Sequence, residues 1–438
     1  MRLTILGGGG FRVPLIYREL IRRPELGVDE LVLADPEPAR LAVIGRIATS
    51  TASLAVRLTG SLAEAVAGAD FVFSAVRVGG PAGRAADERR AVRAGLLGQE
   101  TVGAGGLGYA LRTLPVTQQI ARTVAELAPD AWLINFTNPA GLITEASRIV
   151  LADRVIGICD SPAGLVSRAG RALGRPPEGL LPDYLGINHL GWLRALRAGP
   201  DDLLPGLIDD PDRLLGIEEG RLFGASMIRQ LRAIPNEYLY FYYHSRELAA
   251  AQQAGTTRGE LVRSEQDAFY AAAGADPDRA PALWEKARLS REQSYLAEAR
   301  SDEREVEDLA GGGYERVALR LLRSLAGGPI DQLILNVANG TTVDQLPADL
   351  VIETNCVVDG SGARPLPTAP ANLHQLGLMA GVRAAERAVI EASRTGSYDT
   401  ALFAFTSHPL IASEQAGRQL LDDLLASEPG LLTGEPAA

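Results

Sequence analysis

Cysteine, positive charge and long apolar runs are scarce in this chain of 438 residues, and each scarcity excludes a class of protein. The two cysteines, Cys159 and Cys356, are too few for a disulfide framework and are not spaced as a zinc motif. No apolar run reaches the roughly 18 residues that a membrane-spanning helix requires. The formal net charge of −11 argues against binding to nucleic acid or to an anionic membrane. We therefore expect a cytoplasmic protein with no nucleic-acid or membrane partner.

The first 160 or so residues alternate between short β-branched runs and helical stretches, a pattern typical of a doubly wound parallel sheet. The expected strands are Leu3–Leu6, Leu31–Ala34, Phe71–Val76, Trp132–Phe136 and Val155–Cys159. Longer helices and isolated strands at Asp331–Val337 and Leu350–Val358 follow, and they indicate a second, mixed α/β domain. We expect domains at residues 1–165 and 166–432 and a disordered tail at 433–438.

A run of glycines, Gly7 to Gly10, follows the first expected strand and opens a helix. Such a turn lets the backbone approach a pyrophosphate at the helix N-terminus. Arg12 stands where the usual fingerprint has its third glycine, so the turn alone is weak evidence. Asp35 ends the next expected strand, where a carboxylate binds the ribose hydroxyls of NAD and disfavours NADP. The glycine run and Asp35 together predict an NAD site. The alternative is a tight strand–helix turn that binds no ligand.

Further polar segments follow the third and fourth expected strands. Residues 77–89 and 98–106 are rich in glycine and charge, so we expect a functional loop at the ligand edge of the sheet. Asn135 and Asn138 flank the turn after the fourth strand, and we expect one of them to cap the next helix.

Cys159 ends the fifth expected strand, and His189 follows it further along the chain. Taken alone, each residue would more often have a structural role in the core. Together at the ligand edge, a thiolate and an imidazole suit a divalent transition metal that keeps open positions for substrate oxygens. Tyr238 begins a cluster of tyrosines, which usually serve in packing. A tyrosine beside a cation can also act as a base, because positive charge lowers its pKa.

In their order along the chain, these segments resemble the NAD- and Mn²⁺-dependent glycosidases of glycoside hydrolase family 4. The matching segments are the glycine-rich start, Arg77-Val-Gly-Gly, Gly98-Gln-Glu-Thr, Asn135-Phe-Thr-Asn-Pro-Ala-Gly, Cys159-Asp160, Asn188-His-Leu-Gly-Trp and Pro235 to Leu239. The resemblance covers nearly the whole chain. It implies the fold of lactate and malate dehydrogenases, which is a Rossmann-type doubly wound parallel sheet followed by a mixed α/β domain. It also implies a homodimer or homotetramer.

The resemblance assigns a role to individual residues. It implies that Cys159 and His189 bind Mn²⁺ or another divalent metal, and that Tyr238 is the catalytic base. The implied cofactor-binding residues are Gly7, Gly8, Gly9, Gly10, Phe11, Asp35 and Arg77. The implied substrate-binding residues are Arg84, Asn138 and Arg258, the last of them near the substrate phosphate.

The activity that the resemblance implies is hydrolysis of a 6-phospho-β-glucoside, such as a phosphorylated disaccharide or aryl glucoside. In the family mechanism, NAD⁺ takes a hydride from carbon 3 of the sugar, and the metal polarises the resulting ketone. The tyrosine then removes the proton on carbon 2, the aglycone leaves from carbon 1, water adds and the hydride returns. This mechanism is an exception to the usual pair of catalytic carboxylates.

Asp160 leaves the anomeric preference open. Members of the family that act on α-glucosides often carry an acid directly after the metal-binding cysteine, where it protonates the leaving group. A 6-phospho-α-glucosidase is therefore the alternative, although the Asn135–Gly141 segment and the short spacing from His189 to Tyr238 favour the β anomer. Two less favoured alternatives are a 2-hydroxy-acid dehydrogenase, which needs no metal cysteine, and a non-catalytic NAD-binding sensor.

Overall fold

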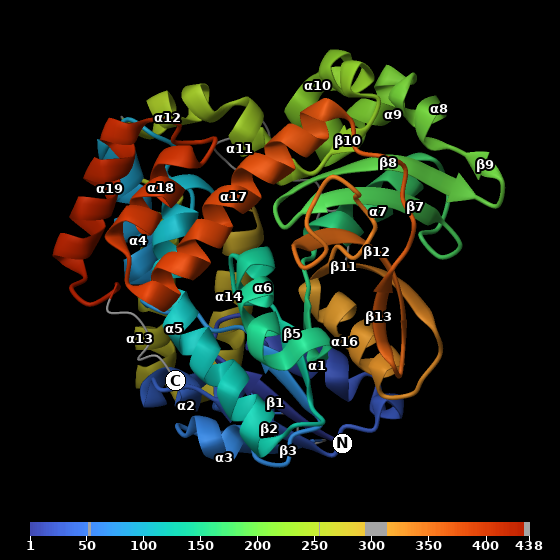
Figure 1. The fold of residues 1–438 in the computed structure, drawn as a ribbon. Helices are drawn as coiled ribbons and strands as arrows, with labels where there is room; N and C mark the ends of the chain where they lie inside the picture. Colours follow the sequence, from blue (N-terminus) through green and yellow to red (C-terminus); the bar gives the residue numbers. More distant parts are fainter. Residues whose placement is uncertain (51–53, 254, 294–312, 433–438) are drawn as a thin grey trace. The chain divides into compact units, whose positions relative to one another are not determined.

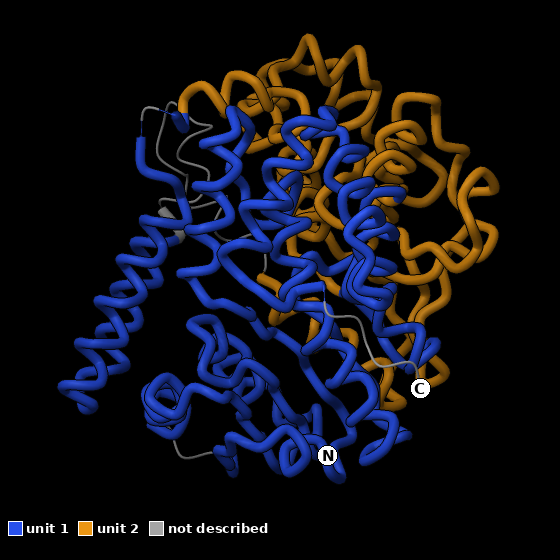
Figure 2. The backbone as a smooth tube through the Cα atoms, turned by 60° about the vertical axis from the view of Figure 1, so that its left-hand side comes forward, with its two compact units in different colours: residues 1–157, 252–291, 384–438 blue, residues 158–251, 292–383 orange. Residues whose placement is uncertain are grey.

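The computed structural model describes residues 1–50, 54–253, 255–293 and 313–432. The chain divides into two compact units, coloured separately in Figure 2. The first comprises residues 1–157, 252–291 and 384–438, and the second comprises residues 158–251 and 292–383. These units differ from the predicted domains, because two later segments of the chain return to the first unit. The predicted tail at 433–438 lies outside the described residues.

A parallel sheet with the strand order β6-β5-β4-β1-β2-β3 forms the centre of the first unit. Its strands are β1 (Arg2–Leu6), β2 (Glu30–Ala34), β3 (Ala55–Thr59), β4 (Phe71–Ser74), β5 (Trp132–Asn135) and β6 (Val155–Gly157). Apolar strands such as β1 and β4 are almost wholly buried, as expected where helices cover both faces. The order reverses between β1 and β4, and a ligand-binding crevice commonly lies beyond such a switch point. The predicted doubly wound sheet is confirmed.

Helices of several lengths accompany this sheet, and they can be followed in Figure 1. They are α1 (Val13–Ile21), η1 (Pro24–Leu26), α2 (Pro38–Thr49), α3 (Leu62–Val66), α4 (Gly80–Arg93), α5 (Gly103–Leu127), α6 (Ala140–Leu151), η2 (Ala152–Arg154), α13 (Arg258–Ala275), η4 (Pro277–Arg279), α18 (Tyr398–Ser407) and α19 (Glu414–Ser427). Three further helices continue from one unit into the other along the chain, namely α12 (Ser245–Gln253), α14 (Ala280–Gln293) and α17 (Leu373–Thr395).

The loop conformation expected for residues 77–89 and 98–106 is wrong, since α4 occupies Gly80–Arg93 and α5 begins at Gly103. The sequence of helix α4 is largely polar, yet three of its charged side chains are buried, namely Arg84, Asp87 and Glu88. Arg84 pairs with Glu88 on the same helix, and Asp87 pairs with Arg112 on α5. Because ion pairs satisfy these side chains inside the unit, the helix has a buried face that apolar periodicity does not reveal.

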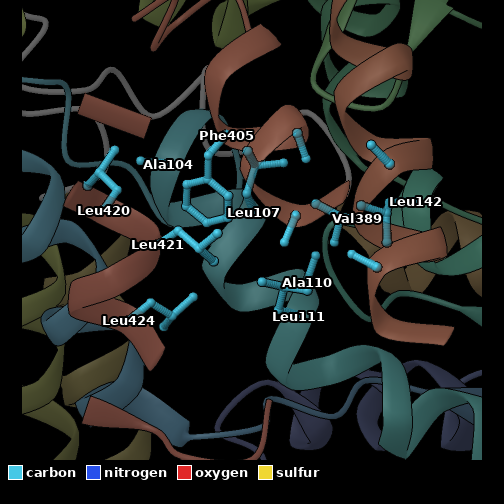
Figure 3. Packing of buried hydrophobic residues seen from close by; sticks show 14 of the residues in the cluster. Ala104, Leu107, Ala110, Leu111, Leu142, Val389, Phe405, Leu420, Leu421 and Leu424 are labelled. Carbon is cyan, nitrogen blue, oxygen red and sulfur yellow. The ribbon is translucent and has the colours of Figure 1, made fainter. Parts of the chain in front are cut away.

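The apolar core of the first unit includes a cluster in which helices distant in sequence meet (Figure 3). Helix α5 contributes Leu107 and Leu111, and α17 contributes Val389. The C-terminal helices α18 and α19 add Phe405 and Leu424 to the same cluster. The return of residues 384–438 to the first unit is therefore an apolar packing effect.

The second unit combines antiparallel strands with helices, so the predicted mixed α/β character is confirmed. Its strands are β7 (Leu181–Ile187), β8 (Leu190–Ala198), β9 (Asp201–Asp202), β10 (Ile234–Pro235), β11 (Asp331–Ala338), β12 (Val351–Asp359) and β13 (Gly362–Pro365). Its helices are α7 (Ser161–Ala172), α8 (Leu204–Ile208), α9 (Pro211–Leu215), α10 (Glu218–Leu231), η3 (Glu237–Leu239), α11 (Tyr240–Tyr243) and α16 (Tyr314–Leu325). Within the described part of the chain, no helix has both the length and the apolarity needed to cross a bilayer.

Substitution of Phe405 tests the core contribution of the C-terminal helices. Phe405 is 2% exposed within the cluster, so Phe405→Ala should lower the free energy of unfolding by about 3–5 kcal/mol. Phe403 lies on the same helix and is 57% exposed, so Phe403→Ala should change the free energy of unfolding by about 0.5 kcal/mol or less. Denaturant titrations of both variants measure the difference. Equal losses would contradict the core assignment.

Candidate active site

The glycine run of the first unit is held tightly against neighbouring strand ends. The amides of Gly7 and Gly8 both donate to the carbonyl of Ala34, at 2.9 and 2.8 Å. Gly7 has a φ of 81°, and a Cβ added to it would lie 2.6 Å from the carbonyl oxygen of Ala75. A Cβ on Gly8 would lie 2.7 Å from the backbone nitrogen of Ala34. Only glycine therefore fits this turn at these two positions.

Helix α1 begins directly after the turn. Among the described residues no side chain caps it, and its first turn contains no acidic residue. Such an end carries partial positive charge from its backbone N–H groups, which favours an anion. Phe11, a predicted cofactor residue, is buried and packs edge-on against Phe269, with ring centroids 5.3 Å apart. Its carbonyl accepts a hydrogen bond from the Trp284 indole at 2.7 Å.

Asp35 lies beside the glycine turn, as the sequence predicts for the two parts of a dinucleotide site. One oxygen of its carboxylate, Oδ2, accepts a hydrogen bond of 2.9 Å from the amide of Gly9. The other, Oδ1, accepts from the amide of Glu37 at 2.9 Å. Burial raises the pKa of the Asp35 carboxyl above its ordinary value. The turn and the acid therefore form one local arrangement.

The predicted residues Arg77 and Arg84 share a half-buried carboxylate, that of Glu100. Arg84 Nη1 lies 2.9 Å from Glu100 Oε1, and Arg77 also pairs with Glu100. Arg84 Nε donates to Glu88 Oε1 at 2.7 Å. Although burial alone would raise the pKa of Glu100, the charges of Arg84 and Arg77 lower it to about 2. Glu88 and Glu100 were not predicted as site residues, because a sequence does not show which carboxylates an arginine will meet.

Glu88 links Arg84 to the backbone of Gly259, the residue that follows Arg258. The amide of Gly259 donates to Glu88 Oε2 at 2.5 Å, while Glu88 Oε1 accepts from Arg84. A capping box between Thr257 and Glu260 begins α13 at Arg258 and fixes the start of this helix. The start of α13 thus lies near Arg84, while the Arg258 side chain itself donates from Nη2 to the backbone carbonyl of Arg291 at 3.3 Å.

The prediction that Asn135 or Asn138 caps a helix is wrong. Pro139 occupies the N-cap position of α6, and no side chain caps this helix within the described chain. The Asn135 amide instead donates to the carbonyls of Thr137 and Ala140, each at 3.2 Å. Asn138 Oδ1 is buried and has no hydrogen-bond partner among the described residues. A buried acceptor without a donor is costly, so Asn138 is suited to receive a hydrogen bond from a ligand.

In the second unit, the predicted metal ligand His189 stacks directly on the predicted base Tyr238. Their ring centroids are 3.7 Å apart, and the ring planes differ by 1°. His189 lies in the short turn between β7 and β8, where its φ is 62°. A non-glycine residue is rarely found in this left-handed conformation, and such residues are enriched at functional sites. This hairpin was not predicted from the sequence.

The segment that carries Cys159 is joined to the segment that carries Tyr238. Ser161 Oγ donates to Glu237 Oε1 at 2.5 Å, and both residues are buried. Asp160 occupies the N-cap position of α7, but its side chain makes no capping hydrogen bond.

Several carboxylates act on Cys159. Burial, together with the charges of Glu353 and Asp160, raises the pKa of the Cys159 thiol well above its ordinary value. Burial raises the pKa values of Glu353 and Glu237 to about 7 each. A divalent cation would offset this crowding of negative charge and favour the thiolate. The donor chemistry around Cys159 therefore fits a metal.

A metal at this site would have few protein ligands. In the described part of the chain, no group of three or more His, Cys, Asp or Glu side chains is arranged to hold an ion. A pair of ligands such as Cys159 and His189 leaves most positions to substrate oxygens or water, as expected for a catalytic rather than a structural metal.

The other tyrosines of the cluster make packing contacts. The Tyr243 hydroxyl accepts from the Trp192 indole at 3.2 Å and lies 2.9 Å from His374 Nε2. Tyr240 stacks on His244, with centroids 4.3 Å apart. The distinct role of Tyr238 within this cluster stays a prediction.

Comparisons with known proteins identify two family models and several relatives that match this chain. The model of the family 4 glycosyl hydrolases matches residues 2–174, and that of the family 4 glycosyl hydrolase C-terminal domain matches residues 184–411. A 6-phospho-beta-glucosidase of Escherichia coli (strain K12) is 30% identical over 452 residues, covering 97% of this chain and 94% of that protein. A 6-phospho-alpha-glucosidase of Leptotrichia buccalis is 25% identical, covering 97% and 96%.

Solved structures show the same similarity. The 6-phospho-beta glucosidase from Thermotoga maritima, solved with manganese, NAD⁺ and glucose-6-phosphate, is 25% identical to this chain and has a TM-score of 0.83. The alignment covers 98% of each chain. Because the family models match most of the sequence, and a relative with 30% identity spans it nearly end to end, the chain belongs to family 4 of the glycosyl hydrolases.

Proposed function

We propose that this chain hydrolyses 6-phospho-glucosides, and within that class 6-phospho-β-glucosides, with NAD⁺ and Mn²⁺ as cofactors. The observation that carries the proposal is the stacking of His189 on Tyr238. This stacking brings a candidate metal ligand into contact with a candidate general base. The base is a phenol, unlike the pair of carboxylates that most glycosidases use. In the same unit, Cys159 is buried and its thiol pKa is raised by burial and by the charges of Glu353 and Asp160. Relatives named as 6-phospho-glucosidases support the substrate class.

The cofactor sites follow from the local geometry. The glycine turn with Asp35 is suited to NAD⁺, with Phe11 and Arg77 as further contacts, and Cys159 and His189 are suited to Mn²⁺. When bound, NAD⁺ supplies a hydride acceptor for carbon 3 of the sugar, and Mn²⁺ supplies a Lewis acid for the neighbouring sugar oxygens. The Thermotoga maritima enzyme was solved with both groups, which supports this assignment.

The chain's own residues perform the remaining work. Tyr238 removes the proton on carbon 2 of the sugar, and a cation near its phenol would favour the phenolate. Arg258 is suited to the substrate phosphate, because guanidinium groups bind phosphate through charge-assisted hydrogen bonds. Arg84 is a further contact to the substrate. Asn138 Oδ1 accepts from a sugar hydroxyl, which satisfies its buried lone pairs. A homodimer or homotetramer is the expected assembly.

Asp160 bears on the anomer. It directly follows Cys159, where an acid that protonates the leaving group is expected in a 6-phospho-α-glucosidase. The β preference is supported by the 30% identity to the Escherichia coli β enzyme, compared with 25% for the Leptotrichia buccalis α enzyme. We therefore retain hydrolysis of the α anomer as the second candidate function.

Nitrophenyl 6-phospho-α- and β-glucosides distinguish these candidates. With NAD⁺ and Mn²⁺ present, we expect release of nitrophenol from the β anomer without accumulation of NADH, and we expect EDTA to abolish it. Cleavage of the α anomer alone would overturn the β assignment. Stoichiometric NADH would indicate a dehydrogenase, and absence of turnover with either anomer would indicate a non-catalytic NAD-binding protein.

Removal of the Tyr238 hydroxyl tests the base. Tyr238→Phe should lower kcat by about 100-fold or more, because a general base typically contributes this factor, while KM changes little. Tyr240→Phe is the matched control, since Tyr240 belongs to the same cluster but stacks on His244. A Tyr238→Phe enzyme with wild-type kcat would remove this residue from the mechanism.

The buried cysteines provide a matched pair for the metal. Cys159→Ser should raise the Kd for Mn²⁺ by at least tenfold, because the soft thiolate is lost. Cys356→Ala, which changes an equally buried cysteine on β12, should leave this Kd unchanged. Electron paramagnetic resonance of free Mn²⁺ measures both values without substrate. Equal affinity in the two variants would contradict the metal assignment.

Asp35 tests the choice of dinucleotide. A carboxylate at this position repels the 2′-phosphate of NADP, so Asp35→Ser should weaken NAD⁺ binding and raise the affinity for NADP⁺ relative to NAD⁺ by about tenfold or more. Calorimetric titration of each dinucleotide gives the ratio. A ratio that stays at the wild-type value would show that Asp35 does not contact the ribose.

A further inference from the structure

Glu353 on β12 is completely buried, and both oxygens of its carboxylate are hydrogen-bonded. Oε1 accepts from Asn336 Nδ2 at 2.9 Å and from Asn188 Nδ2 at 3.4 Å. Oε2 accepts from the Tyr184 hydroxyl at 3.2 Å. These donors are neutral amides and a phenol, so they provide no charge to balance a buried carboxylate. Such a group is costly in a core, and an apolar side chain would fill the space at lower cost.

One branch of this network reaches the predicted metal ligand. Asn188 directly precedes His189 in the turn between β7 and β8. The turn holds His189 at a φ of 62°, a conformation that non-glycine residues adopt only where their surroundings enforce it. The hydrogen bond from Asn188 to Glu353 ties this turn to β12.

A second branch reaches the predicted base. The Tyr184 hydroxyl donates to Glu353 and accepts from Asn236 Nδ2 at 3.3 Å. Asn236 Oδ1 in turn accepts from the amide of Tyr238 at 2.9 Å, which starts the short helix η3. A Cβ on Gly191 would lie 2.3 Å from the Tyr184 hydroxyl, so glycine at 191 makes room for this branch.

We propose that Glu353 is a positioning residue that sets the relation between His189 and Tyr238 through these two branches. The inference rests on the proposed function, since it takes His189 as a metal ligand and Tyr238 as the base. Glu353 accepts from both branches at once, one on each carboxylate oxygen. It thereby couples the orientation of the imidazole to the orientation of the phenol.

Glu353→Gln tests the coupling, because glutamine has nearly the same volume but only one oxygen that can accept. Loss of a residue that orients a metal ligand typically costs about 10- to 100-fold in metal affinity, so we expect the Kd for Mn²⁺ to rise by this factor. We also expect kcat to fall by about tenfold or more, because the base is misplaced, with a smaller change in KM. Paramagnetic resonance of free Mn²⁺ gives the Kd in the absence of substrate.

Tyr184→Phe separates the branches. It removes only the hydroxyl that links Glu353 to Asn236, while the hydrogen bond from Asn188 to Glu353 remains. We therefore expect kcat to fall by about tenfold. The Kd for Mn²⁺ should stay within about twofold of the wild-type value, because the branch to His189 is intact.

Thr354→Val is the matched structural control. Thr354 is the next residue on β12, is completely buried, and donates from Oγ1 to the backbone carbonyl of Tyr184 at 3.1 Å. The variant loses a buried hydrogen bond on the same strand without altering Glu353. We expect a lower melting temperature together with wild-type Mn²⁺ affinity and wild-type kcat.

Wild-type Mn²⁺ affinity and kcat in a folded Glu353→Gln variant would overturn the inference. If this variant does not fold, Tyr184→Phe decides, and a wild-type kcat in that variant would overturn it. Equal losses of Mn²⁺ affinity in Glu353→Gln and Thr354→Val would also overturn it, since they indicate a purely structural role. A wild-type chain that binds no Mn²⁺ and cleaves no 6-phospho-glucoside would overturn the proposed function and this inference with it.

Discussion

The buried hydrogen bond from Ser161 to Glu237 ties the segment that carries Cys159 to the segment that carries Tyr238. It joins positions 76 residues apart, one following Cys159 and the other preceding Tyr238. Arg168 lies close to Glu237 and pairs with Glu218 and Glu219, so a single guanidinium serves three buried carboxylates. Negative charge therefore accumulates beside the thiol, and a cation is the simplest means of balancing it.

The doubly wound sheet could be predicted because its signals are local. Its β-branched strands are short and apolar, and the glycine run at Gly7 follows the first of them. Strand β3 was missed, since at the sheet edge its side chains are mostly exposed or half-buried. Helix α4 was predicted as part of a loop because its buried face carries charged side chains instead of apolar ones. These charges are balanced by partners such as Arg112 and Glu100. Such ion pairs between distant residues cannot be predicted from the sequence.

The candidate site was predictable only in part for the same reason. Short sequence motifs that can be recognised without a structure contain Cys159, His189 and Tyr238. Glu353 cannot be recognised in this way, because its partners Asn188 and Tyr184 lie 165 and 169 residues away. Local propensity also misled at Asn135, whose amide is occupied by loop carbonyls and by Thr144 rather than by a helix end. Hydrogen-bond partners that are distant in sequence require the fold.

The chain leaves the first compact unit after residue 157 and returns to it at residues 252 and 384. During synthesis, the N-terminal strands and helix α5 therefore emerge long before α18 and α19, which supply Phe405 and Leu424 to their common core. Helices α4 and α6 can cover part of α5 early, but the part of α5 that packs against α18 and α19 stays uncovered until almost the whole chain has left the ribosome. A nascent chain of this kind depends on protection from aggregation throughout its translation, and a premature stop near the C-terminus would damage the unit that is translated first.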